Sequence, residues 1–226
     1  MSNLERLIAS FFNAEVALRY LPRIAEGMLV TFGLGLAVIV TGVAVGLGLA
    51  ILRALRIPFT RWMIVGFADI FRALPPLVII IVLYFAFPYI GLSMNAFTAT
   101  WLSLSLVLAA FAEEVFWAGI LSVHKAQWDA ALSLGMSHWK SLCEVILPQA
   151  IRLTVPPLTN RVISITKGTA LGSVVALHEI LNVASSGASE AGNPTPLTLG
   201  AIAYLILFIP FVWFGRRLEK RFAWKR

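Results

Sequence analysis

The stretch that decides the fold is ALPPLVIIIVLYFAFPYIGLSMNAFTATWLSLSLVLAAFA, residues 73–112, which holds 40 residues without a charged side chain. As a single helix it would be roughly 60 Å long, about twice the thickness of a bilayer's hydrocarbon core. The chain therefore has to reverse direction within this stretch. Turn-forming residues mark the place of the reversal: Pro88, Gly91, Ser93 and Asn95. We expect one membrane span to end before this turn and another to begin after it.

The composition of the whole chain agrees with a membrane environment. Of its 226 residues, 59% are hydrophobic and 13% charged, and the mean hydropathy is +0.87. Soluble globular proteins carry about a quarter charged residues. We expect an all-α integral membrane protein with a single transmembrane domain over residues 1–226. Its five spans should lie at about 24–52, 62–87, 96–120, 153–177 and 195–215, with a polar cytoplasmic loop at 121–150.

The distribution of Lys and Arg predicts the orientation of these spans. The two loops at 88–100 and 178–194 contain neither residue, and the N-terminal segment contains three. The remaining loops and the C-terminal segment hold twelve: Arg53, Arg56, Arg61, Lys125, Lys140, Arg152, Arg216, Arg217, Lys220, Arg221, Lys225 and Arg226. Because positive loops stay in the cytoplasm, we expect the N-terminus outside and both the C-terminus and the central loop inside.

Several kinds of chemistry are missing from the sequence. There is no glycine-rich phosphate loop, and the three histidines are too scattered to form a metal site. The single cysteine, Cys143, has no partner for an internal disulfide. The basic residues flank the spans instead of forming an aromatic-interleaved patch, so nucleic-acid binding is not expected. We predict a protein that is not an enzyme and whose energy source, if it needs one, lies on another chain.

Charged residues within the expected spans need a partner or a cavity, because a charge in hydrocarbon costs a few kcal/mol. Asp69 and Arg72 are three residues apart on one helical face, which would allow them to pair. Two alternatives remain open: internal ion pairs with interfacial snorkelling, or side chains that line a polar passage. Similarly, Gly42 and Gly46 form a small-x-x-x-small pair that serves either helix packing within the chain or a seam between subunits.

The central polar loop has the pattern of two short helices joined by a glycine turn. Asp129 is expected to start the first helix and Gly135 to stop it, and Ser137 is expected to cap a second helix over about 138–146 that ends at Pro148. Ala130 and Ala131 would let a partner approach closely, and three residues would offer apolar anchors: Trp128, Met136 and Trp139. The alternative is an amphipathic pair lying on the lipid headgroups.

The spacing Asp129-Ala130-Ala131, three residues, Gly135, nine residues, Val145-Ile146-Leu147-Pro148 resembles a known loop. It is similar to the Glu-Ala-Ala, Gly, Ile-x-Leu-Pro loop of permease subunits of ATP-binding-cassette (ABC) importers. Phe71-Arg72-Ala73-Leu74-Pro75 looks like the Phe-Arg-Gly-Thr-Pro of the branch that carries polar amino acids such as histidine, glutamine and arginine. Lys167-Gly168-Thr169-Ala170-Leu171 looks like its Lys-Asp-Thr-Ser-Leu. Trp117 and Gly168 depart from that branch, which usually has arginine and aspartate there.

This resemblance implies a type I ABC importer permease in the bacterial cytoplasmic (inner) membrane, with no cofactor of its own. It implies an ATPase dimer that holds ATP and Mg, a second permease subunit, identical or paralogous, and an extracytoplasmic solute-binding protein. The residues implied in ATPase coupling are Gln127, Trp128, Asp129, Ala130, Ala131, Gly135, Met136 and Ser137. Those expected along the solute path are Asp69, Arg72, Glu113, Glu114, Lys167 and Thr169. A stand-alone secondary carrier that uses intramembrane carboxylates is the alternative, although five spans give no paired inverted repeat.

Overall fold

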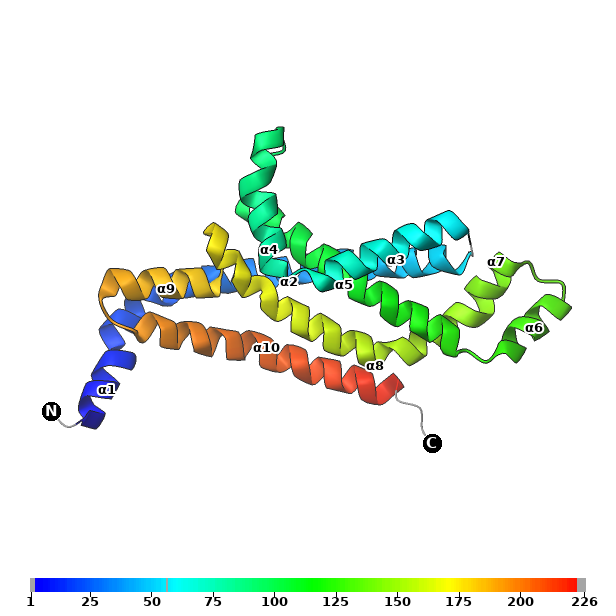
Figure 1. The fold of residues 1–226 in the computed structure, drawn as a ribbon. Coiled ribbons are helices and arrows are strands. Elements are labelled where there is room, and N and C mark those ends of the chain that lie inside the picture. The colour runs from blue at the N-terminus through cyan, green and yellow to red at the C-terminus, as the bar shows by residue number, and fades with distance from the viewer. Residues whose placement is uncertain (1–2, 56, 223–226) are drawn as a thin grey trace. The chain divides into compact units, whose positions relative to one another are not determined.

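The computed structural model describes residues 3–55 and 57–222, which are helical almost throughout and contain no strand (Figure 1). Arg56, Lys225 and Arg226, which contribute to the predicted charge asymmetry, lie outside the described residues. The α-helices are α1 (Asn3–Phe11), α2 (Ala14–Ala54), α3 (Pro58–Ala73), α4 (Pro76–Ile81), α5 (Ala96–Ser122), α6 (Lys125–Ser133), α7 (His138–Ser141), α8 (Leu147–Thr166), α9 (Ile180–Ala191) and α10 (Thr195–Phe222). Four shorter segments continue three of these helices. The π-helical η1 (Val82–Ala86) and the 3₁₀-helical η2 (Phe87–Ile90) follow α4, the π-helical η3 (Leu142–Ile146) follows α7, and the 3₁₀-helical η4 (Lys167–Val175) follows α8.

Three described helical segments are long and apolar enough to cross a membrane: Glu5–Ala54, Ala96–Ser122 and Thr195–Phe222. A fourth exists if Pro58–Ala73 and Pro76–Ile90 together form one broken span. The expected helix starts near 96 and 195 are thus confirmed. The expected span at 153–177 is not among these helical segments: α8 covers its first part with 20 residues that include Gln149, Asn160, two arginines and two internal prolines, and 3₁₀ turns follow from Lys167. The five-span topology therefore stays a prediction.

The expected second span is interrupted where α3 ends. Leu74 has extended backbone angles, φ −81° and ψ 131°, because the residue before a proline is driven out of the helical region. Pro76 then starts α4, which continues through η1 and η2 to Gly91. Gly91 has φ +82°, and its N–H donates to the carbonyl of Pro88. The chain reversal expected between residues 88 and 95 is therefore confirmed.

The chain forms two compact units, each assembled from three segments. The first unit comprises residues 1–37, 77–103 and 166–213. Its buried apolar cluster consists of Ile24, Ile180, Ala184 and Ala203, which come from α2, α9 and α10. In the same unit Gly27 lets α2 lie against the start of α9, since a Cβ there would lie 3.2 Å from the backbone of Glu179 and Ile180.

The second unit comprises residues 38–76, 104–165 and 214–226. Its α2 and α5 segments pack very closely at two glycines. A Cβ at Gly42 would come within 2.8 Å of the Leu108 side chain, and one at Gly46 within 2.5 Å of the Ala112 Cβ. The small-x-x-x-small pair of α2 therefore serves packing between helices of the same chain, the first of the two alternatives.

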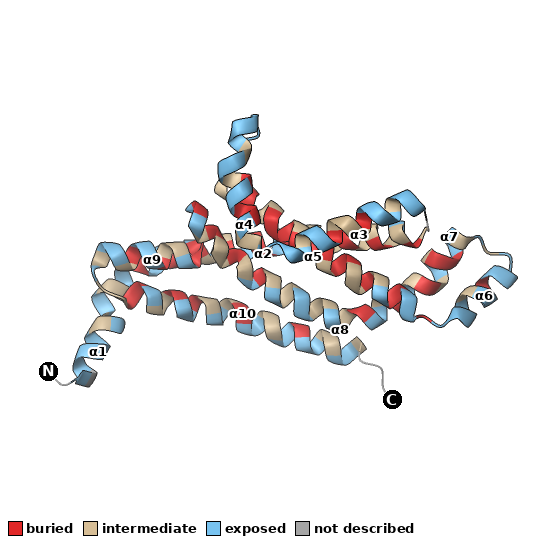
Figure 2. Ribbon diagram, in the orientation of Figure 1, coloured by how far each residue is buried: buried red, intermediate tan, exposed pale blue. Residues whose placement is uncertain are grey.

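Many large apolar side chains remain exposed on the long helices. Examples are Leu18, Leu29 and Trp62, which are between 73% and 77% exposed. Figure 2 shows exposed positions along much of α3 and α10. An apolar surface of this extent is stable only against lipid or another protein.

Candidate coupling site and charged cluster

The first helix of the polar loop, α6, begins four residues earlier than Asp129. Its N-terminal cap is His124, whose Nδ1 accepts a hydrogen bond from the Ala126 N–H at 3.2 Å. Because a capping acceptor is available at His124, the helix starts at Lys125 and Asp129 lies in its middle. The prediction that Asp129 starts this helix is wrong.

The predicted stop at Gly135 is confirmed, and its geometry is specific. Gly135 has φ +80°, its N–H donates to the Leu132 carbonyl, and the Met136 N–H donates to the Ala131 carbonyl. These are the two hydrogen bonds of a Schellman motif, which ends a helix with a left-handed residue. A Cβ at Gly135 would meet nothing within 4 Å, so backbone conformation alone favours glycine there.

The second helix starts at its predicted cap and then runs further than expected. The Ser137 Oγ accepts a hydrogen bond from the Lys140 N–H at 3.3 Å, and α7 begins at His138. It continues as η3, where the Leu147 N–H donates to the Leu142 carbonyl, and then directly into α8. The prediction that this helix ends at Pro148 is wrong. The proline follows the π-helical turn and sits in the first turn of α8, where a missing N–H is tolerated.

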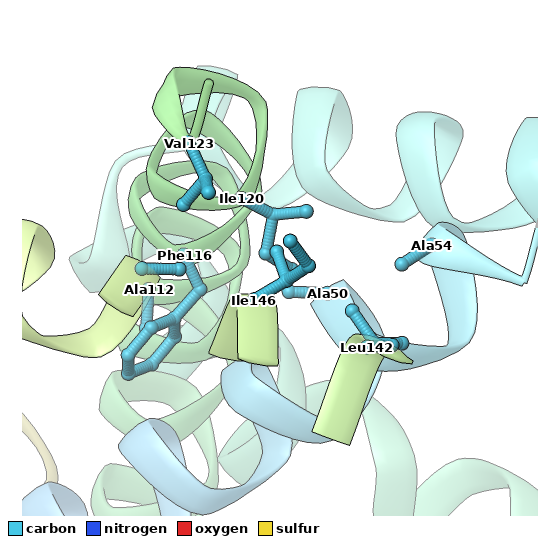
Figure 3. Close-up of a cluster of buried hydrophobic side chains, with 9 residues drawn as sticks. Ala50, Ala54, Ala112, Phe116, Ile120, Val123, Leu142 and Ile146 are labelled. Atoms are coloured by element: carbon cyan, nitrogen blue, oxygen red, sulfur yellow. The ribbon is translucent and has the colours of Figure 1, made fainter. Parts of the chain in front are cut away.

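The two short helices and their glycine turn, residues 125–146, are called the coupling loop below. Its base is held by an apolar cluster that joins the loop to α2 and α5 (Figure 3). Leu142 and Ile146 of the loop are fully buried, and they cluster with Ala50, Phe116 and Ile120. Within the loop, the Trp128 and His138 rings stack with centroids 4.7 Å apart and an interplanar angle of 19°. The loop is therefore a packed extension of the helices and not a flexible linker.

The exposed apolar side chains of the coupling loop differ in part from those expected. Ala131 is 3% exposed and Trp128 packs against the buried cluster, so both residues support the loop from inside. Leu134 is instead 83% exposed and Trp139 is 53% exposed. Leu132, also exposed, and Leu134 were not among the expected apolar anchors. Exposed apolar side chains at the tip of a packed polar loop are typical of a protein contact surface.

The Arg53–Glu113 ion pair joins α2 to α5 beneath the coupling loop. Arg53 Nη1 donates to both Glu113 carboxylate oxygens, at 2.9 and 3.3 Å. The Glu113 side chain is fully buried, that of Arg53 is 15% exposed, and the Arg53 guanidinium lies 4.6 Å from the centroid of the Trp117 ring. Trp117, one of the two departures from the polar amino-acid branch, thus acts here as a platform for a cation. We find no structural account of the other departure, Gly168.

A second ion pair connects α3 to α5, and it differs from the pair expected on α3. Arg72 bonds to Glu114 at 2.9 Å, whereas Asp69 is exposed. Both partners are partly accessible, with side chains 33% and 46% exposed. Phe111 lies beneath two cations, since the guanidinium carbons of Arg72 and Arg161 are 5.7 and 4.5 Å from its ring centroid. The structure therefore brings Arg72 and Glu114 together, near Glu113, with the Phe111 ring against the Arg72 guanidinium.

The other two predicted path residues, Lys167 and Thr169, belong to the first unit. Lys167 is exposed at the start of η4, and the buried Thr169 Oγ1 donates to the Thr166 carbonyl at 2.9 Å. Thr169 therefore has a structural role in the 3₁₀ turns, while Lys167 is accessible.

Sequence reasoning missed a buried carboxylate in the first unit. Glu179 is fully buried at the N-terminal cap of α9, where it accepts hydrogen bonds from the Leu181 and Asn182 N–H groups and from the Tyr204 hydroxyl at 2.7 to 2.9 Å. Burial raises the pKa of the Glu179 carboxyl above its usual range, although these donors act in the opposite direction. Its position directly before an apolar helix start was the available signal.

Long apolar helices, charged side chains paired within them and a packed polar loop define a class: a helical membrane subunit with a surface built to contact another protein. Comparison with known proteins gives the family. Residues 42–224 match the family described as the binding-protein-dependent transport system inner membrane component. The chain belongs to this family, whose members are the membrane permease subunits of ABC transporters.

Individual relatives and solved structures agree. The chain is 34% identical over 213 residues to the probable amino-acid ABC transporter permease protein YckA of Bacillus subtilis, with 94% of each chain covered. It is 33% identical to the probable glutamine ABC transporter permease protein GlnP of the same organism, covering 87% of this chain and 92% of that one. A crystal structure of an amino acid ABC transporter with histidines superposes with a TM-score of 0.81 at 29% identity, over 90% of this chain and 96% of the other.

Family membership also fixes the coarse setting of the chain. It is a transport subunit of the inner membrane, and such systems work with an ATPase and a solute-binding protein.

Proposed function

We propose that this chain forms part of the translocation path for a polar amino acid or a related small solute, and that a separate cytoplasmic ATPase drives the transport. The observation that carries the proposal is the coupling loop, a rigid loop with exposed apolar residues at its tip and a base packed into the membrane helices. The names of its relatives, which include permeases for amino acids and for glutamine, support the substrate class.

In the mechanism we infer, the coupling loop transmits movement from the ATPase to the membrane helices. Leu134 and Trp139 are exposed at its surface and would sit in a groove of the ATPase. Because η3 runs without a break into α8, and Leu142 and Ile146 are buried against α2 and α5, displacing the loop displaces these helices with it. ATP binding would bring two ATPase subunits together, and the two attached loops would follow them.

We propose that the solute path includes the pair formed by Arg72 and Glu114. The two side chains are partly accessible, unlike Glu113, whose carboxylate is fully buried and whose role we assign to holding α2 against α5. A half-exposed guanidinium and carboxylate would offer the complementary charges that an amino acid's carboxylate and ammonium groups need. Asp69, Lys167 and Thr169 remain predictions as path residues.

The partners we propose are a dimer of ATPases that holds ATP and Mg, a second permease subunit, identical or paralogous, and a solute-binding protein outside the membrane. The chain itself would need no cofactor and have no nucleotide site. A stand-alone carrier is not favoured, because the most buried carboxylate within a span, Glu113, is already paired with Arg53.

Reconstituted uptake tests this function. The chain is placed in proteoliposomes with its ATPase and binding protein, and accumulation of radiolabelled polar amino acids is measured with ATP enclosed in the vesicles. We expect accumulation only with ATP and with an ATPase able to hydrolyse it, and competition by unlabelled polar amino acids but not by sugars. Uptake of equal rate in vesicles that contain the chain without any ATPase would overturn the proposal in favour of the carrier.

A further inference from the structure

A basic cavity lies beside the coupling loop in the second unit. Its volume is about 780 Å³, and it lies among residues at or next to the ends of α5, α6, α8 and α10. Its polar lining residues are Ser122, His124, Gln127, Gln149, Arg152 and Arg221, and its apolar ones are Val123, Leu153 and Phe222. Among the described residues that line it there is no carboxylate. The cavity therefore combines two guanidinium groups with neutral hydrogen-bonding side chains.

The two arginines have charge to offer to a ligand. Arg152 and Arg221 are both exposed, and neither forms an ion pair with any residue in 3–55 or 57–222. By contrast Arg23, Arg53 and Arg72 each contact a glutamate at 2.9 Å. A guanidinium presents a planar set of donors that matches a phosphate group, with which it forms bidentate hydrogen bonds.

The neutral side chains of the cavity wall are held in place by hydrogen bonds. The Gln149 Nε2 donates to the Val145 carbonyl at 2.8 Å and to the Gln127 Oε1 at 3.4 Å. His124 accepts from the Ala126 N–H through Nδ1, and a ring that accepts through Nδ1 carries its proton on Nε2, which is a further donor. The wall thus adds the His124 Nε2–H as a donor beside the two arginines, while the two N–H groups of Gln149 serve to hold the wall together.

The depth of the cavity in the membrane favours a lipid headgroup. The apolar part of α10, residues 195–215, is roughly 31 Å long and fills the hydrocarbon core. Arg221 follows it by six residues, about 9 Å, which corresponds to the headgroup layer on the side predicted to be cytoplasmic. Anionic lipid headgroups give this surface a negative potential that attracts Lys and Arg.

We propose that this cavity binds the phosphate group of an anionic phospholipid headgroup through Arg152 and Arg221. A bound headgroup would connect the end of α10 with the start of α8 next to the coupling loop, so lipid composition would influence how firmly the loop is held. Free phosphate has the same chemistry, and an ATPase surface is the competing occupant. The proposal concerns lipid binding by the chain and does not depend on which solute is transported.

The test measures lipid retention in two charge-matched variants. Arg152→Gln/Arg221→Gln removes the cavity's two charges, and Arg216→Gln/Lys220→Gln removes two charges from the same membrane side at residues that do not line it. Each chain is incorporated into phosphatidylcholine nanodiscs with a minor fraction of photoactivatable phosphatidylglycerol. The labelled lipid per chain is counted by mass spectrometry, after gel filtration has confirmed the same folded, monodisperse species.

We expect wild type and the control variant to capture phosphatidylglycerol equally, and the cavity variant to capture at least fivefold less. A tenfold excess of inorganic phosphate over the labelled lipid should not displace it, because phosphate lacks the membrane anchoring of the lipid. Equal capture by both double variants would overturn the proposal. Complete displacement by inorganic phosphate would do so too, by assigning the cavity to free phosphate. Unchanged lipid capture with a loss of ATPase binding only in the cavity variant would assign the cavity to the ATPase instead.

Discussion

The buried ion pair between Arg53 and Glu113 allows a prediction of defined sign and size. Glu113→Leu leaves a guanidinium that is only 15% exposed without its carboxylate. Removing one partner of a buried pair costs about 3–5 kcal/mol, because the remaining charge is uncompensated. Arg53 keeps its contact with the Trp117 ring at 4.6 Å in the variant, so we expect a loss in the lower half of that range, about 3–4 kcal/mol.

The double variant Arg53→Met/Glu113→Leu makes this reasoning specific. It removes both charges and replaces them with apolar side chains of similar length, so no charge is stranded. We expect its free energy of unfolding to lie within about 1 kcal/mol of wild type, since apolar replacement of a buried pair is often neutral. The double variant should therefore be more stable than the single one by roughly 3 kcal/mol.

The assay is unfolding of the purified chain in mixed micelles by increasing the fraction of sodium dodecyl sulfate, followed by circular dichroism. Glu114→Gln serves as the control. It alters an ion pair whose side chains are 33% and 46% exposed, which predicts a change of about 1 kcal/mol or less. A single variant Glu113→Leu as stable as wild type, or a double variant as unstable as the single one, would refute the assignment of a buried, mutually dependent pair.

Three further predictions concern the turn, the path and the packing of the chain. Gly135→Val should cost about 1–2 kcal/mol locally and lower the uptake achieved per ATP hydrolysed, while Gly135→Asn should keep coupling because asparagine tolerates the left-handed backbone. Gly135→Asp should also uncouple ATP hydrolysis from uptake, through its charge at the loop surface. Normal coupling in both the Val and the Asp variant would contradict a lever role. Arg72→Ala and Glu114→Gln should each lower the transport rate or alter solute preference in competition assays, and if neither does, the pair is structural. Gly46→Leu, where a Cβ already overlaps α5, should destabilise the chain by about 1–3 kcal/mol or more in the micelle assay, whereas Gly48→Leu, with open space around it, should not.

The parts of the fold that depend on local chemistry could be predicted from the sequence. The reversal near Gly91 and the stop at Gly135 follow from residues that take a left-handed backbone without strain. The helix start at Thr195 follows Pro194, and α7 follows its Ser137 cap. In each case one or two neighbouring residues decide the outcome.

The parts that depend on distant residues were not predictable in the same way. From the sequence, Asp69, three residues away, was the expected partner of Arg72, whereas the structure pairs Arg72 with Glu114 on another helix, which sequence spacing does not reveal. The start of α6 was misplaced because histidine is an uncommon helix cap, and Pro148 was read as a stop because the π-helical turn before it has no simple sequence signature.

The central claim is that the coupling loop transmits force by contact with an ATPase, and crosslinking measures that contact directly. In a Cys143→Ser background, which removes the chain's single cysteine, new cysteines are placed at Leu134 or Ala130 on the loop surface, and at Leu29 on an apolar, exposed face of α2 as the control. Native membranes are treated with a short bifunctional thiol reagent, and crosslinked partners are identified by mass spectrometry. We predict capture of a nucleotide-hydrolysing subunit from positions 130 and 134, in a yield that changes on addition of ATP, and none from position 29. Failure to capture such a subunit from either loop position, in membranes that retain ATP-dependent uptake, would contradict the account.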